Sequence, residues 1–98
     1  MATATMEPVW LIEATCAPDA AESRVPFRAE HLARFVELKA AGVVIEVGGV
    51  ADVSASVVML RAPSAEAALD ICRQDVYTKN GIWVEFRVRP FNRVVVAG

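Results

Sequence analysis

The order of strand and helix patterns is the feature that most limits the folds open to this chain of 98 residues. Four segments have the apolar, β-branched composition typical of strands, and two have the periodicity typical of amphipathic helices. The strand patterns cover residues 9–15, 43–48, 54–61 and 82–89, and the helical patterns cover residues 26–41 and 64–74. This β-α-β-β-α-β order predicts a ferredoxin-like α+β fold, with both helices on one face of a four-stranded antiparallel sheet.

Local signals at the ends of these segments agree with the predicted order. Pro26 suits the first position of a helix, and Gly42 suits a left-handed stop after it. Ser64 is a good N-cap for the second helix, and Asn80-Gly81 predicts a turn before the last strand. Pro90 is expected to close that strand. We also expect the two helices to run roughly parallel.

Composition limits the class of protein. Residues 1–8 contain neither a basic cluster nor an apolar run, and we expect a flexible leader ahead of a single domain over residues 9–98. The net charge is -2, and no block of basic residues indicates nucleic-acid binding. No apolar run approaches the roughly 18 residues of a membrane span. Two cysteines outside any C-x-x-C pair do not define a disulfide framework, which favours a reduced, cytoplasmic setting.

The apolar content and the last strand together predict a homodimer. Hydrophobic residues make up 55% of the chain, which is high for a small monomer. Alternation in the last strand predicts that one side lies beneath the helices, formed by Ile82, Val84, Phe86 and Val88. The opposite side would carry Trp83, Glu85, Arg87 and Arg89. A face that mixes tryptophan with paired charges favours packing against a second copy around ligand-accessible space.

His31 is the only histidine, and it falls within the apolar stripe of the first helix, with Arg28 at the margin one turn earlier. One interpretation is a hydrogen-bonded core histidine, since buried polar groups are usually satisfied. The other is a group for proton transfer, with Arg28 holding an anion. Periodicity alone leaves both open.

Several short motifs, in this order, resemble the YCII-related (YciI-like) family of the dimeric α/β-barrel superfamily. They are Arg28-Ala29-Glu30-His31-Leu32, preceded by Arg24, then Ala40-Ala41-Gly42-Val43, Ser64-Ala65-Glu66-Ala67, Asp75-Val76-Tyr77 and Arg89-Pro90-Phe91. The chain departs from the family pattern at two places, where Val76 replaces a proline and Gly48-Gly49 replaces Gly-Pro. The resemblance implies a dimeric α/β barrel whose active site contains a histidine and an aspartate, here His31 and Asp75.

Asp75 and Tyr77 also have structural interpretations. Asp75 is well placed to cap the turn after the second helix, and Tyr77 to pack in the core. If the helices run parallel, Asp75 lies far from His31 along the fold. Their meeting would then require a staggered helix, a bent loop or the other subunit.

The residues and the resemblance lead to two hypotheses. The first is a cofactor-free lyase or isomerase acting on a small organic molecule, ring-shaped and anionic. His31 would be the general acid or base, Asp75 would orient it, and Arg28, Arg24 and Tyr77 would bind substrate. The second is a non-catalytic ligand-binding or interaction module that uses the same pocket. We expect no metal site, because one histidine and scattered carboxylates do not supply converging ligands.

Overall fold

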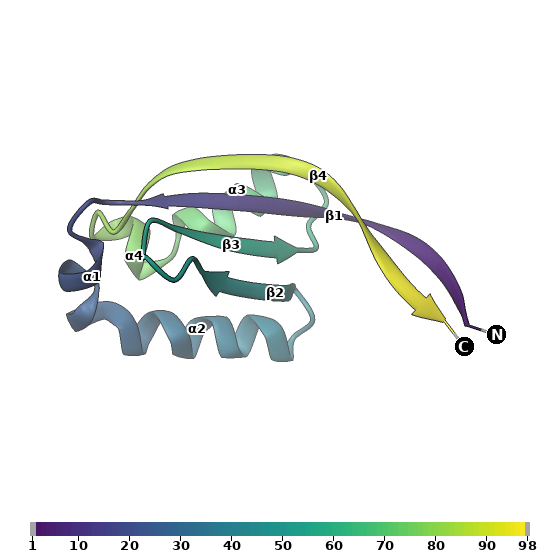
Figure 1. The fold of residues 1–98 in the computed structure, drawn as a ribbon, viewed down its shortest axis with the longest axis horizontal. Helices are drawn as coiled ribbons and strands as arrows, with labels where there is room; N and C mark the ends of the chain where they lie inside the picture. Colours follow the sequence, from purple (N-terminus) through teal and green to yellow (C-terminus); the bar gives the residue numbers. More distant parts are fainter. Residues whose placement is uncertain (1, 98) are drawn as a thin grey trace.

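A computed structural model describes residues 2–97 and contains four strands and four α-helices among them. The strands are β1 (Thr3–Cys16), β2 (Val44–Gly49), β3 (Ala55–Leu60) and β4 (Trp83–Ala97). The helices are α1 (Ala20–Ser23), α2 (Arg28–Ala40), α3 (Ala65–Arg73) and α4 (Val76–Lys79), with a 3-10 turn at Val25–Phe27 before α2. Figure 1 shows this arrangement.

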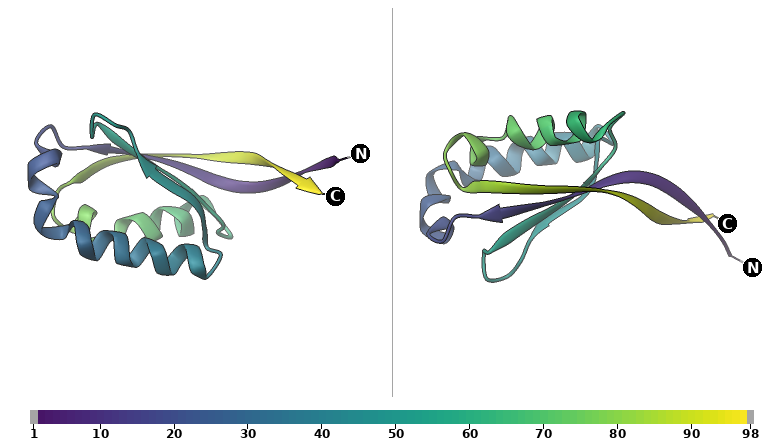
Figure 2. Two further views of the ribbon diagram at one scale, coloured as in Figure 1. Left: turned by 60° about the horizontal axis from the view of Figure 1, so that its bottom comes forward. Right: turned by 90° about the horizontal axis from the view of Figure 1, so that it is seen from above.

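The strands form one antiparallel sheet in the order β2-β3-β1-β4. Both long helices cover the same face, and within residues 2–97 the opposite face carries no helix (Figure 2). The ferredoxin-like α+β fold and its β-α-β-β-α-β order are therefore confirmed. The helices α2 and α3 run in opposite directions (Figure 1), so the prediction that they run parallel was wrong.

Helix ends follow the local signals in the sequence. Gly42 has a φ of 76°, the left-handed conformation that stops α2. The Ser64 hydroxyl accepts a hydrogen bond from the backbone N–H of Ala67 at 3.1 Å and caps α3. Gly81 has a φ of 71°, which turns the chain from α4 into β4.

The core lies between the sheet and the two long helices. Strands β1 and β3 contribute Ile12, Ala14, Val58 and Leu60, all fully buried. From the helices come Phe35 of α2 with Ala68 and Cys72 of α3. Cys16 and Cys72 are both free thiols.

Two long strands extend beyond the body of the sheet. The segment predicted as a flexible leader is strand from Thr3 onward, and it pairs with the end of β4, from Thr3↔Ala97 to Pro8↔Asn92. Pro90 does not end β4 because this strand lies at the sheet edge, where a residue without an N–H is tolerated. The two strand ends form a protruding ribbon (Figures 1 and 2), which we call the arm.

A register shift changes the faces predicted for β4. Cys16 pairs with Trp83 and Thr15 with Glu85, which leaves Val84 as an extra residue. As a result Trp83 points into the core and is 2% exposed, whereas Val84 is 57% exposed. The prediction that Trp83 lies on the helix-free face, with Val84 beneath the helices, was wrong. Past the shift, Phe86 and Val88 pack against the core as predicted.

None of the helices in residues 2–97 has the length and apolarity needed to cross a membrane.

Candidate active site

His31 and Asp75 contact each other within one chain. The Nδ1 atom of His31 lies 2.6 Å from Oδ2 of Asp75, and both side chains are buried. The opposite directions of α2 and α3 explain the contact, because the start of one helix lies beside the end of the other (Figure 1). The pair therefore needs neither a stagger nor a second subunit to form.

Asp75 also has the structural role that the sequence allowed. It is the N-cap of α4, and its Oδ2 accepts a hydrogen bond from the backbone N–H of Tyr77 at 3.1 Å. This hydrogen bond within the turn thus fixes the carboxylate in the orientation in which it contacts His31. Capping and contact with the histidine are compatible in this geometry.

Arg34 is a third member of this group that the sequence analysis missed. Its Nη1 donates to Oδ1 of Asp75 at 3.0 Å, and its Nη2 donates to the backbone carbonyl of Ile71 at 2.8 Å. The signal was its spacing: Arg34 follows His31 by three residues, which places both on one face of α2. The arginines predicted from the sequence were Arg28 and Arg24 instead.

Aromatic rings hold the His31 imidazole in one orientation. Tyr77 stacks on it, with ring centroids 3.7 Å apart and an angle of 3° between the planes. Trp83 meets it edge-on at 5.2 Å, and Phe35 lies at 5.0 Å. Since Nδ1 faces Asp75, Nε2 is the ring nitrogen left without a hydrogen-bond partner among residues 2–97.

A cavity of about 130 Å³ opens beside the ring. Four of the five predicted site residues line it, namely Arg24, Arg28, His31 and Tyr77. The remaining lining residues are Leu32, Phe35, Val47, Gly48, Gly49 and Ser56. Asp75 lies behind His31 rather than in the cavity wall. The cavity therefore combines two arginines with the apolar side chains of Leu32, Phe35 and Val47.

The carboxyl of Asp75 is held in its charged form. Burial raises its pKa, but the His31 hydrogen bond and charge, the Tyr77 N–H and Arg34 together outweigh burial, so that the pKa is lowered. Burial raises the pKa of Tyr77, while Arg24 and Arg28 act in the opposite direction. The phenol therefore stays protonated at neutral pH and is able to donate a hydrogen bond.

The thiols are not activated. Burial, with the Asp75 charge, raises the pKa of Cys72 to about 12. The pKa of Cys16 is also raised by burial, against the opposing effects of Ser56 and Arg24. Both sulfur atoms are therefore protonated near neutral pH.

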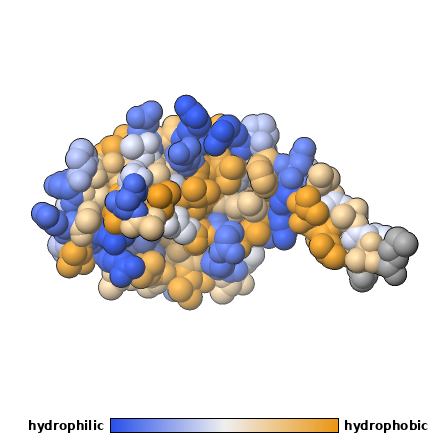
Figure 3. Space-filling model, viewed as in Figure 1, coloured by the Kyte–Doolittle hydropathy of each residue, from blue (hydrophilic) through white to orange (hydrophobic). Residues whose placement is uncertain are grey.

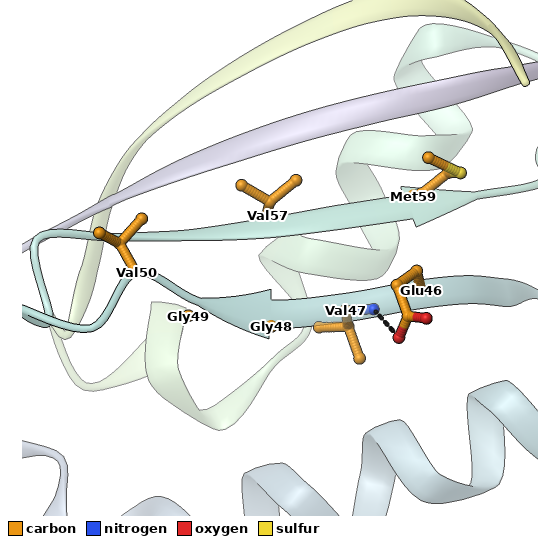
Figure 4. A pocket seen from close by; sticks show the side chains of 7 residues that line it. All are labelled: Glu46, Val47, Gly48, Gly49, Val50, Val57 and Met59. Atoms are coloured by element: carbon orange, nitrogen blue, oxygen red, sulfur yellow. Dashed lines mark hydrogen bonds between the residues drawn. The ribbon is translucent and has the colours of Figure 1, made fainter.

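A larger hollow of about 370 Å³ lies at the β2–β3 edge of the sheet. Figure 4 shows Val57 and Met59 projecting from β3, two of the residues that line it, whereas Val47 points from β2 toward α2. Val47, Gly48 and Gly49 line both this hollow and the cavity at His31. Glu46 is the one titratable residue in the lining of this hollow. The groups suited to acid–base chemistry therefore line the smaller cavity at His31.

Residues 2–97 contain no group of three or more His, Cys, Asp or Glu side chains arranged to hold a metal ion. His31 and Asp75 are both occupied with each other and with neighbouring groups.

Comparisons with known proteins agree with the fold and the motifs. Residues 9–92 match the model of the YCII-related domain. A similar solved structure is 5-chloro-2-hydroxyhydroquinone dehydrochlorinase (TftG) from Burkholderia phenoliruptrix AC1100, in complex with 2,5-dihydroxybenzoquinone. It is 24% identical, has a TM-score of 0.69, and the match covers 83% of this chain and 90% of that one. No curated protein matches the chain.

Proposed function

We propose, from the premise that this chain belongs to the YCII-related family, that it is a cofactor-independent enzyme for a small, ring-shaped, anionic molecule. His31 is its general acid or base, and the reaction is an elimination or an isomerisation. One observation carries the proposal: the buried His31–Asp75 contact lies behind a cavity that also presents two arginines.

The geometry supports proton transfer at Nε2 of His31. With Asp75 as a carboxylate, Nδ1–H of His31 donates a hydrogen bond to its Oδ2, which fixes the tautomer and leaves the Nε2 lone pair free to accept a proton. When Nε2 takes that proton, the adjacent carboxylate stabilises the imidazolium that forms. General acid or base catalysis of this kind contributes about 10²–10⁴ in rate.

The two arginines supply charge stabilisation. As His31 removes a proton from the substrate, the electron pair left behind forms a new double bond or is carried on an oxygen atom. Arg28 and Arg24 line the cavity and are placed to hold that oxyanion. In an elimination, a leaving group then departs with its bonding pair; in an isomerisation, His31 returns the proton to another atom.

The size and walls of the cavity favour a planar ring. Leu32 and Phe35 offer apolar contact, while the Tyr77 hydroxyl offers a donor. The dehydrochlorinase of similar fold was solved with 2,5-dihydroxybenzoquinone, an anionic ring at neutral pH, and we propose substrates of this class.

A turnover assay tests the enzyme proposal. Wild-type protein is mixed with halogenated hydroxy-aromatics, quinones and lactones, and substrate loss and halide release are followed. We expect turnover of at least one class, reduced about 10²-fold or more in His31→Ala. Lys79→Ala, at an exposed position outside the cavity, is the control. Absence of turnover across the panel, with retained ligand binding, would support a non-catalytic binding module.

We also propose a homodimer and a cytoplasmic setting. The helix-free face of the sheet mixes apolar residues with charged ones (Figure 3). On it lie exposed Val57 and an ion pair between Arg89 and Glu13, with N···O at 3.8 Å. The arm exposes Met6, Val94 and Val96. Burial of these surfaces against a second copy accounts for the high apolar content.

A further inference from the structure

Arg34 is a cation bound to the acid behind the proposed base, and nothing in the proposed reaction requires it to touch substrate. It is absent from the cavity lining, and its two hydrogen bonds go to Asp75 and to the Ile71 carbonyl. Its side chain is 27% exposed, whereas that of Asp75 is fully buried.

A fully buried carboxylate needs a compensating charge. Without Arg34, the cation in direct contact with Asp75 would be His31 in its protonated form. The carboxylate would then retain a proton on the imidazole, and a histidine that is already protonated cannot act as a base. Arg34 compensates Asp75 whether or not His31 carries a proton.

We propose that Arg34 is a positioning residue that lets His31 stay neutral beside a buried carboxylate, and so act as a base. It binds Oδ1 and leaves Oδ2 for the histidine. It also repels a second positive charge on the imidazole. The catalytic consequence rests on the proposed function, but the effect on protonation does not.

Other charged groups near His31 set the background for this effect. Arg28, at the start of α2, and Arg24, at the end of α1, line the same cavity as the ring. Tyr77 stacks on it from α4, and Cys16 lies near Tyr77 at the end of β1. Tyr77 and Cys16 both have raised pKa values, so they are neutral near pH 7. All four groups are unchanged in the variants below.

The test is an NMR titration of the His31 ring in the intact protein without ligand. The chain has one histidine, so its ring signals are unambiguous. In Arg34→Gln we expect the midpoint of the titration to move to higher pH by about one unit. In Arg34→Lys, which keeps the charge, we expect most of the wild-type value to be restored. Arg73→Gln removes an exposed arginine paired with Glu66 and Asp70, and should move nothing.

The direction of the shift separates charge compensation from simple support of the loop. If Arg34 merely tied α2 to the end of α3, its loss would free Asp75 from His31 and move the midpoint down or leave it in place. Either result would overturn the inference. If Arg34→Gln does not fold, Arg34→Met, which is also uncharged, is titrated in its place: an upward shift supports the inference, and a downward shift or none overturns it.

These outcomes are independent of turnover. An upward shift in Arg34→Gln with an inactive wild type would reject the enzyme proposal and retain the role of Arg34. An active wild type with no upward shift in Arg34→Gln would support the enzyme proposal and reject the role of Arg34.

Discussion

The residues around His31 show how one carboxylate serves two purposes. Asp75 caps a short helix and also contacts the histidine, and Arg34 completes its shell of donors. The alternatives in the sequence, a turn cap or a partner of His31, were therefore not exclusive. His31 is itself stacked and hydrogen-bonded, so its replacement should also cost stability, and only loss of binding or turnover identifies its function.

At the residue scale, Asp75→Asn should change the pH dependence of stability. Asp75 has a lowered pKa in the folded protein, so its contribution is present above its ordinary value, about 3.9, and is lost as pH falls through the folded value. Near pH 7 we expect the variant to lose roughly 2 kcal/mol in the free energy of unfolding.

The measurement is denaturant unfolding of both proteins between pH 3 and pH 7. The difference between them should shrink as pH drops below about 4. A difference that stays constant over this range would show that the charge on Asp75 does not stabilise the fold.

At the scale of elements, the sequence patterns predicted the order of strands and helices because each pattern is local. The directions of the helices and the register of strand pairing, by contrast, depend on parts of the chain that are far apart in the sequence. The opposite directions of α2 and α3, which bring His31 to Asp75, follow from alternating strand directions rather than from either helix. The register shift beside Cys16 depends on pairing with a strand about 70 residues away in the chain, and no turn residue marks it.

The register shift predicts unequal costs for two neighbouring substitutions. Trp83 is buried among Phe35, Tyr77 and Phe86, and its indole N–H donates to Ser56 Oγ at 3.1 Å. Trp83→Ala should therefore cost about 3–5 kcal/mol in the free energy of unfolding. Val84→Ala, at an exposed position, should change it by less than about 0.5 kcal/mol. Equal costs in denaturant unfolding would contradict the shifted register.

At the scale of the whole molecule, the sequence patterns did not predict the arm. Residues 3–8 lack the apolar run of a strand. Pro90 predicted the end of the last strand, whereas β4 continues past it to Ala97. The structure is 48 Å along its longest axis and 25 Å along the next, and its arm is a two-stranded ribbon. An isolated two-stranded ribbon is marginally stable in water, which fits the proposal that a second copy covers it.

The homodimer proposal predicts a mass twice the 10.6 kDa of one chain in sedimentation at micromolar concentration. Val57→Glu, on the helix-free face, should weaken the dimer at least about tenfold, or about 1.4 kcal/mol. Val36→Glu is the matched control, since Val36 is an exposed valine of α2. A wild type that sediments only as a monomer would reject the dimer, and equal weakening by both variants would reject this face as the contact.

We propose that a small anionic ring binds in the cavity at His31. Titration of 2,5-dihydroxybenzoquinone into the protein, followed at the His31 ring signals by NMR, tests it most directly. We predict a saturable shift of those signals in the wild type. Arg28→Gln should need at least about tenfold more ligand for the same shift, since it removes one charge-assisted contact. Ring signals that stay unmoved at high ligand concentration, or that respond equally in both proteins, would contradict binding of this ligand in the cavity at His31.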